Sequence, residues 1–370
     1  MLCRSPRRHQ VTIIVRLRHI RMTLSFPVAR LMCLLFMLAW FQFVGSAHAE
    51  SVLRVLAWPG YADADVVAAF EKKTGARVEV SFVNTDDELW TRLSTNNGDD
   101  FDVFAVNTAE LQRYIDNGLS APLNLTEIPN QARQLPRFRQ ISAIPGLMRG
   151  QNLYAIPFTY AEMGLIYNRK LVAQEPVSMD AMWDPQYQGK VLAYGGGVHN
   201  FSIAALLDGS KNPFRLTSDE LRAASRRLVG LRRNVLAFYS SPEEAVQLYL
   251  ENEVALVFAN FGTQQVQALR AAGADIGYVV PKQGVLAWLD CWSITGRARS
   301  PQLAAKWIDG TLQADASTRF SERHGLANTV TTTSLSNPGD KLFWLQPPEH
   351  TDKRQALWAR ILSGDILRKF

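Results

Sequence analysis

Two tryptophans and one aspartate stand at alternate positions in the otherwise apolar segment LAWLDCWSIT, residues 286–295. Side chains of a strand alternate between its two faces, so Trp288, Asp290 and Trp292 are predicted to point the same way. A buried carboxylate needs a partner, because an unpaired charge is costly to remove from water. Indole faces attract cations, and a carboxylate binds ammonium groups through charge-assisted hydrogen bonds. The segment therefore indicates either a site for a cationic ligand or an internal ion pair with a lysine or arginine.

Further aromatic and polar residues follow predicted strands, at positions where an α/β sheet binds its ligands. Trp58 and Tyr61 follow the predicted strand 52–57, in the loop WPGYAD. The polar residues that follow two other predicted strands, 101–106 and 254–258, are Asn107, Thr108 and Asn260. Ligands of open α/β sheets bind at the carboxyl ends of the strands. We therefore expect all five residues near a ligand-binding site.

The sequence lacks the motifs of a serine hydrolase and of a zinc protease, since neither G-x-S-x-G nor H-E-x-x-H occurs. The three histidines after residue 49 lack metal-ligand spacing, so we predict neither a metal site nor a cofactor. His199 follows the glycines 195–197 and is either a binding residue or an ordinary polar loop residue. Cys291, the single cysteine after residue 49, is interpreted as a small core residue. An enzyme that uses Cys291 or His199 is the weaker alternative to a binding protein.

The net positive charge of the chain comes from its N-terminal segment. The formal net charge is +6, but residues 1–49 contain seven arginines and no acidic residue, which leaves 33 basic against 34 acidic residues in the remainder. That remainder shows no basic stripe with interleaved aromatic residues, so we predict no nucleic-acid partner. The N-terminal segment carries an apolar run at 31–45, too short for a comfortable membrane span, and ends in Ala47-His48-Ala49. This pattern predicts a secretory signal peptide over residues 1–49.

Strands and helices alternate in the chain that follows. The first predicted strands, 52–57, 77–83 and 101–106, are separated by predicted helices, of which the second opens with TDDE at 85–88, a sequence that resembles a capping box. Such alternation predicts a parallel α/β sheet. Further strands are predicted over 163–167, 191–194, 254–258, 278–280 and 286–295, and further helices over 203–208, 218–231 and 354–362. The length and the apolar content are sufficient for two cores.

The order of these segments resembles the periplasmic spermidine/putrescine-binding proteins, the receptors of polyamine ABC importers. The resemblance extends over nearly all of the chain after residue 49. The segments that carry it, in family order, are LRVLAWPGYAD, FDVFAVNTAEL, YAIPFTYAEMGLIYN, WDPQYQGKVLAYG, NVLAFYSSPEEAVQLYLENEVALVFAN and VVPKQGVLAWLDCWSIT. Their order and spacing are more specific than any one of them alone.

The resemblance implies an α/β fold of the type II periplasmic binding protein class, in which two lobes hold the ligand in the cleft between them. We expect crossings between the lobes near 158–160 and near Trp288. The signal peptide, 1–49, is then followed by a first lobe of 50–158 plus 288–335 and a second lobe of 159–287 plus 336–370. Closure of such lobes is a population shift that contacts from both lobes stabilise.

The resemblance also assigns residues to the ligand site. Trp58, Tyr61, Trp288 and Asp290 match the family residues that surround and hold an amine. The acidic residues of the family's second lobe fall on the glycines 195–197 and on His199, so the partner for the other end of the ligand is altered; Glu162 is a candidate replacement. Two ligand classes remain open: a polyamine, or an ω-amino acid whose carboxylate is received by the glycine-rich segment with His199.

The function implied is that of a periplasmic solute-binding protein, not an enzyme. It is expected to bind a small amine-containing ligand, a polyamine of the putrescine/spermidine class, and to deliver it as a monomer to the permease subunits of an ABC transporter in the inner membrane. A receptor for an ω-amino acid is the alternative. A role in signalling, in which the closed form docks on a sensor, has the same sequence features.

Overall fold

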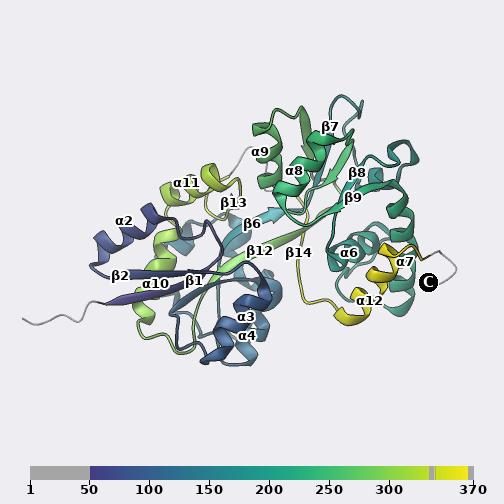
Figure 1. The fold of residues 1–370 in the computed structure, drawn as a ribbon. Coiled ribbons are helices and arrows are strands. Elements are labelled where there is room, and N and C mark those ends of the chain that lie inside the picture. The colour runs from purple at the N-terminus through teal and green to yellow at the C-terminus, as the bar shows by residue number, and fades with distance from the viewer. Residues whose placement is uncertain (1–50, 333–336, 338, 366–370) are drawn as a thin grey trace, which may run out of the picture. The chain divides into compact units, whose positions relative to one another are not determined.

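Two large β-sheets, each with helices packed against it, and one two-stranded sheet are found in the part of the chain that the structure describes (Figure 1). The computed structural model describes residues 51–332, 337 and 339–365. The predicted signal peptide, residues 1–49, lies outside the described residues. Among the described helices, none combines the length and the apolar character needed to cross a membrane.

The larger sheet defines the first lobe and has the strand order β13-β6-β12-β3-β1-β2, with β14 paired to β12. Strand β1 is parallel to β2 and to β3, as the alternating pattern predicts, whereas β12 is antiparallel to β3 and β6. The strands are β1 (Val52–Ala57), β2 (Arg77–Phe82), β3 (Val103–Asn107), β6 (Ile156–Glu162), β12 (Val285–Ile294), β13 (Ala327–Asn328) and β14 (Leu342–Trp344). The helices of this lobe are α2 (Ala64–Thr74), α3 (Asp86–Thr95), α4 (Thr108–Asp116), α10 (Pro301–Thr311) and α11 (Ala314–His324).

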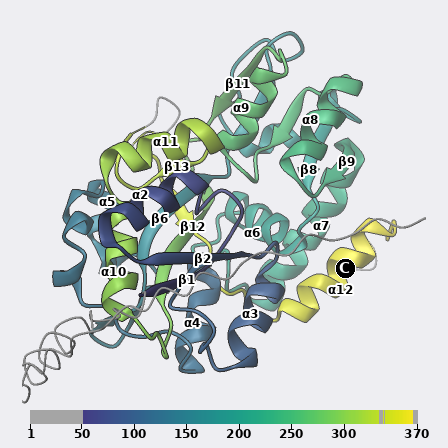
Figure 2. The same cartoon turned by 60° about the vertical axis from the view of Figure 1, so that its left-hand side comes forward.

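The smaller sheet defines the second lobe and has the strand order β11-β7-β10-β8-β9. Its strands are β7 (Leu165–Asn168), β8 (Val191–Tyr194), β9 (Val235–Tyr239), β10 (Leu256–Phe258) and β11 (Ile276–Val279). Its helices are α6 (Gly197–Leu207), α7 (Ser218–Asn234), α8 (Pro242–Glu251), α9 (Thr263–Ala271) and α12 (Thr351–Leu362). Helix α12 contacts both α6 and α7 and lies beside α7 in both views (Figures 1 and 2). The C-terminal segment therefore packs on the second lobe.

Short elements fill the long connection between α4 and β6 and the start of the second lobe. They are the helix α5 (Pro136–Arg139), the paired strands β4 (Met148–Arg149) and β5 (Asn152–Leu153), and 3-10 helices over Leu125–Glu127, Pro129–Arg133, Ile141–Ala143, Met179–Trp183 and Pro185–Tyr187. Prolines begin several of these turns, as expected for residues that lack a backbone N–H.

Strands β6 and β12 pair with each other and pass from one core to the other (Figure 1). On β12, Leu286 packs in the second core and Leu289 in the first, while Trp288 contacts both. On β6, Tyr160 belongs to the first core and Met163, just after the strand, to the second. The two strands therefore connect the lobes, and the residue boundaries of the lobes remain a prediction.

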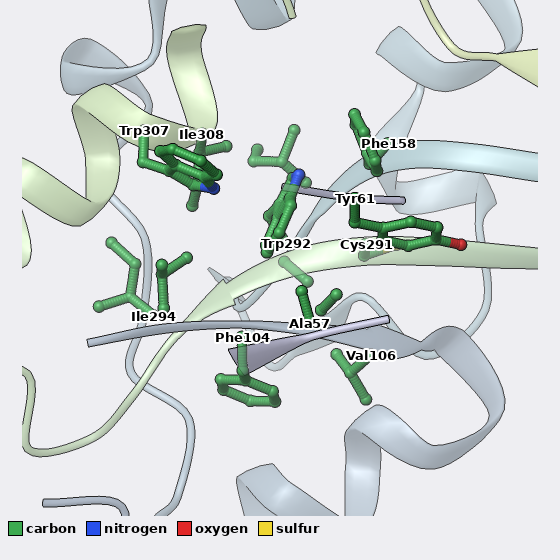
Figure 3. Close-up of a cluster of buried hydrophobic side chains, with 14 of the residues drawn as sticks. Ala57, Tyr61, Phe104, Val106, Phe158, Cys291, Trp292, Ile294, Trp307 and Ile308 are labelled. Carbon is green, nitrogen blue, oxygen red and sulfur yellow. The ribbon is translucent and has the colours of Figure 1, made fainter. Parts of the chain in front are cut away.

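Trp292 lies inside the first core (Figure 3). Its ring packs against those of Tyr61, Phe158 and Trp307, with centroid separations of 6.3, 5.5 and 6.0 Å. Cys291 is 1% exposed in the same core, which confirms its interpretation as a small core residue. The Tyr61 ring is packed within this aromatic cluster, and its hydroxyl is the part of the side chain that makes a polar contact.

Candidate functional site

A pocket of about 660 Å³ lies between the two lobes, where β1, β3, β8, β10 and β12 end or cross. Residues of the first lobe that line it include Trp58, Tyr61, Asp86, Asn107, Glu110 and Asp290. Residues of the second lobe that line it include Tyr194, His199, Asn260, Phe261 and Gln264, and Trp288 stands between the two groups. Seven of the nine residues predicted from the sequence therefore meet in one pocket.

Asp290 is the most thoroughly buried carboxylate of the pocket, with 8% exposure. Its Oδ2 accepts a 2.6 Å hydrogen bond from the Tyr61 hydroxyl, and its Oδ1 accepts one of 2.9 Å from Nδ2 of Asn107. Burial raises the pKa of Asp290 to about 6, while these two donors oppose the shift. Asp290 is therefore predominantly ionised at neutral pH, and it has no lysine or arginine partner among the described residues, so the internal ion pair considered above does not form.

The position of Asp290 follows from strand register and helix capping. Strand β12 pairs with β3 so that Asp290 stands opposite Asn107, the last residue of β3. Asn107 is also the N-cap of α4, where its Oδ1 accepts from the backbone N–H of Ala109. Capping fixes the orientation of the amide, so its Nδ2 points to Asp290. The register of β12 against β6 shifts between Asp290 and Cys291, a bulge of the kind that re-aims side chains near binding sites.

Trp288 joins the two walls of the pocket. Its Nε1 donates a 3.0 Å hydrogen bond to the backbone oxygen of Asn260 in the second lobe, and its ring packs against both cores. Trp58 lines the first-lobe wall, and its Nε1 is buried without a hydrogen-bond partner. Two indoles and one phenol thus surround the Asp290 carboxylate, an arrangement that suits an ammonium group.

The second-lobe wall is uncharged. Nδ1 of His199 lies 2.8 Å from the side-chain oxygen of Asn260, and because an amide oxygen only accepts, the hydrogen is on Nδ1 and Nε2 is left as an acceptor. Burial lowers the pKa of His199, which keeps the imidazole neutral at pH 7. Its ring stacks on Tyr194 at 5.5 Å. This wall can accept hydrogen bonds but supplies no positive charge.

Asp86 and Glu110, in the first turns of α3 and α4, are carboxylates of the pocket that the sequence analysis did not assign to the site. The Asp86 side chain is exposed to solvent at the pocket, but the atoms of the surrounding walls, together with the charges of Asp290, Glu110 and Asp87, raise its pKa to about 7. Desolvation likewise raises the pKa of Glu110, against the lowering effect of Arg113. No lysine or arginine lines this pocket in the described part of the chain. The pocket is therefore acidic.

A signal for these two residues was present in the sequence. Both stand just beyond the carboxyl end of a parallel strand, β2 or β3, which is the position from which Trp58 and Asn107 were predicted. The segment 85–88 was interpreted as a helix cap only, and Thr85 does cap α3 by accepting from the backbone N–H of Glu88. Thr85 therefore caps α3, while the next residue, Asp86, lines the pocket.

Thr108 and Glu162 do not line the pocket. Thr108 is buried in the first turn of α4, and its carbonyl oxygen lies against Gly146, at which an added Cβ would come within 2.5 Å. Glu162 is buried at the end of β6, opposite Ala287, with Arg137 at 3.9 Å. Burial raises the pKa of Glu162 to about 8. The structure therefore places Glu162 in the crossing between the lobes instead of beside a ligand.

The glycines 195–197 also lie outside the pocket. They let the ring of Trp358 approach α6, since a Cβ on Gly197 would lie 2.5 Å from Cγ of that tryptophan. Nε1 of Trp358 donates to the carbonyl oxygen of Gly195 at 2.8 Å. Asn200, which follows His199 on α6, donates its Nδ2 to the carbonyls of Tyr194 and Gly196. The glycine-rich segment thus serves helix packing.

Two α/β lobes, connected by crossing strands and enclosing an acidic pocket with aromatic walls, define a ligand receptor of the type II periplasmic binding protein fold. The chain belongs to the family of bacterial extracellular solute-binding proteins, whose sequence profile matches residues 65–344. This membership confirms the prediction of a solute-binding protein instead of an enzyme. No group of three or more metal-ligating side chains is found in the described residues.

Individual relatives agree with the resemblance seen in the sequence. The chain is 26% identical over 287 residues to the spermidine/putrescine-binding periplasmic protein of Escherichia coli K12, which covers 76% of this chain and 79% of that one. It is 25% identical over 355 residues to the putrescine-binding periplasmic protein PotF of the same organism, with 87% and 94% covered. The solved structure of the spermidine/putrescine transporter substrate-binding protein PotD from Streptococcus pneumoniae superimposes with a TM-score of 0.73 at 18% identity, covering 85% of this chain and 99% of that one. The predicted fold class is thereby confirmed.

Proposed function

We propose that this protein is a periplasmic receptor that binds a polyamine-class cation in the pocket between its lobes and delivers it to the permease subunits of an ABC importer. The observation that carries the proposal is an acidic pocket whose lining contains three carboxylates and, in the described residues, no lysine or arginine. Relatives named for spermidine and putrescine binding support the same ligand class. One chain supplies both walls of the pocket, which supports a monomeric receptor.

An ammonium group would bind at Asp290. The two donors of that carboxylate, Tyr61 and Asn107, hold it in one orientation and keep it ionised, and each carboxylate oxygen retains acceptor capacity. The indole faces of Trp58 and Trp288 add cation–π attraction. A charge-assisted hydrogen bond in such a site contributes about 1.5–3 kcal/mol.

An ω-amino acid fits the pocket less well than a polyamine. Its carboxylate would gain only uncharged donors such as Ser240 and Gln264, because the lining has no lysine or arginine in the described residues and carries the further carboxylates Asp86 and Glu110. The glycine-rich segment that was considered as the carboxylate site lies outside the pocket. A negative ligand group near further carboxylates would be repelled.

The proposal is tested by thermal unfolding of the purified protein with putrescine, spermidine and 4-aminobutanoate. A ligand at 100 times its Kd stabilises the folded state by about 2.7 kcal/mol, which is a clear rise in Tm. We expect a rise with the two polyamines, none with 4-aminobutanoate, and loss of the polyamine effect in Asp290→Asn. Asp352→Asn, an exposed residue in the first turn of α12, is the control. If no amine raises the Tm of the wild type, the proposal is wrong.

Periplasmic location and coupling to a permease are tested in cells. We expect the protein in the periplasmic fraction and reduced uptake of radiolabelled polyamine in a strain lacking the gene, restored by the wild type but not by Asp290→Asn. Normal uptake in the deletion strain, together with polyamine binding in vitro, would favour a signalling receptor. Light scattering of the purified protein tests the monomeric state.

A further inference from the structure

The carboxylates of the pocket form two groups that are attached to different elements. Asp290 belongs to β12 and is satisfied by Tyr61 and Asn107. Asp86 and Glu110 belong to the first turns of α3 and α4 and have no comparable donors from the pocket. The partial positive charge of a helix N-terminus favours an acidic residue there, but it does not neutralise a second and a third carboxylate nearby.

The surroundings of Asp86 and Glu110 leave negative charge uncompensated. The nearest cation to Glu110 is Arg113 at 3.9 Å, which is partly exposed and whose guanidinium also lies 3.6 Å from the centroid of the Trp90 ring. Tyr114 is fully buried nearby, and its hydroxyl has no hydrogen-bond partner. Burial and the charges of Asp86 and Glu110 raise the pKa of Tyr114 above its ordinary value. Three carboxylates line one pocket to which the described residues contribute no lysine or arginine, so a cationic ligand is the partner that this lining favours.

Asp86 lines the same pocket as Tyr194 of the second lobe. Burial and the charge of Asp86 raise the pKa of Tyr194, which lines the opposite wall of the pocket. The Tyr194 ring is held by stacking on His199 and by edge contact with Phe261 at 5.9 Å. A cationic group bound between Asp86 and Tyr194 would have partners from both walls of the same pocket.

Resting on the proposed function, we propose that Asp86 and Glu110 form a second cationic subsite, which binds the other end of a ligand whose first ammonium group is held by Asp290. Selectivity for a dication over a monoamine or an ω-amino acid then comes from the first turns of α3 and α4, both in the first lobe. The second lobe supplies the ring of Tyr194 and neutral acceptors. Contact with both lobes at this end favours the closed state.

The test pairs a change in the protein with a change in the ligand. Isothermal titration measures the Kd of 1,4-diaminobutane and of butylamine, which lacks the second amino group, for wild type, Asp86→Asn and Glu110→Gln. The control is Asp87→Asn, because Asp87 is the next residue of the same helical turn and does not line the pocket. Both aspartate variants remove one acid from the N-terminus of α3, so their effects on the helix are matched.

We expect Asp86→Asn to raise the Kd of diaminobutane about tenfold, which is the loss that follows from one charge-assisted hydrogen bond. Glu110→Gln should also raise this Kd. The Kd of butylamine should change by less than about twofold in Asp86→Asn and in Glu110→Gln. In Asp87→Asn, the Kd of diaminobutane and the Kd of butylamine should each change by less than about twofold. Asp290→Asn should weaken both ligands, which marks the first subsite. Tm values of the unliganded variants verify that each is folded.

Two results would overturn the subsite. In one, diaminobutane binds the wild type but Asp86→Asn and Glu110→Gln behave as Asp87→Asn does. In the other, Asp86→Asn weakens butylamine as much as diaminobutane, which would mean that Asp86 acts only through the field at Asp290. Failure of the wild type to bind any amine is a different outcome, since it contradicts the proposed function itself.

Discussion

The hydroxyl of Tyr61 donates a 2.6 Å hydrogen bond to the carboxylate of Asp290, 229 residues further along the chain. Tyr61 follows the first strand, and Asp290 lies on the strand that returns from the second lobe. The ring of Tyr61 packs edge-on against Phe158, Trp292 and Phe320, so the hydroxyl has little freedom to move away. The carboxylate is thereby held in one orientation before a ligand arrives, which reduces the ordering cost of binding.

Tyr61→Phe should weaken amine binding and change its pH dependence. Binding requires ionised Asp290, whose pKa is raised to about 6, so wild-type affinity should fall as the pH drops through about 6. Loss of a donor that stabilises the carboxylate raises the pKa of Asp290 further, so in Tyr61→Phe the fall begins at higher pH. We expect about a tenfold weaker Kd at pH 7. Titration calorimetry from pH 5 to 8 measures both effects.

Tyr187→Phe, outside the pocket, is the control for that experiment. An unchanged pH profile in Tyr61→Phe would mean that its hydroxyl does not influence the charge of Asp290.

Trp288→Phe should reduce both stability and affinity, because it removes the bond to the Asn260 carbonyl and leaves that acceptor unsatisfied. The expected loss is about 1–3 kcal/mol in the free energy of unfolding. Trp183→Phe is a matched control: its Nε1 donates to the carbonyl of Arg227 at 2.8 Å, away from the pocket. We expect a comparable loss of stability there with unchanged ligand affinity. Equal affinity in both variants would show that Trp288 has only a structural role.

Glu162→Gln should stabilise the protein at alkaline pH. The folded-state pKa of Glu162 is raised from its ordinary 4.5 to about 8 by burial, with Asp340 adding to the shift and Arg137 opposing it. The stability contributed by its protonation is fully present below about pH 4.5 and is lost as the pH rises through about 8. Glutamine resembles the protonated form, so at pH 9 the variant should be more stable by on the order of 2 kcal/mol.

Denaturant unfolding at pH 5 and pH 9 measures this difference, with the exposed Glu127→Gln as the control. A variant that is less stable than the wild type at pH 9 would show that the ion pair with Arg137 outweighs the cost of burying the charge.

Two glycine substitutions should have opposite effects on Tm. Gly197→Ala places a Cβ within 2.5 Å of the Trp358 side chain, close to its attachment point, and should cost about 1–3 kcal/mol. Gly310→Ala meets no atom within 4 Å and lies in helix α10, so it should gain about 0.5–1 kcal/mol. Differential scanning calorimetry compares the two. Equal Tm values would mean that the Trp358 ring moves aside at no cost.

Local residue patterns were sufficient for the first three strands and the C-terminal helix, whereas the convergence of Trp58 and Tyr61 with Trp288 and Asp290 was predicted from the family resemblance. Alternating apolar residues and strand–helix order are properties of short segments, and the rule that parallel strands end at one edge of a sheet then places their loops together. Strand β9 (Val235–Tyr239) was not predicted, because it follows α7 without any turn residue between them. Its pairing with β8 is what establishes it as a strand.

Which acids line the pocket besides Asp290 depended on long-range geometry. Glu162 is acidic and close in sequence to the crossing, yet β6 directs it into the interior beside Arg137. Asp86 and Asp87 are chemically equivalent neighbours in one turn, and only Asp86 lines the pocket. Composition and periodicity predict an α/β chain with Trp288 and Asp290 on one strand, and the family resemblance makes that strand the expected amine site. The rotation of α3 and α4 on the sheet, set by packing between residues distant in sequence, determines which further acids line the pocket.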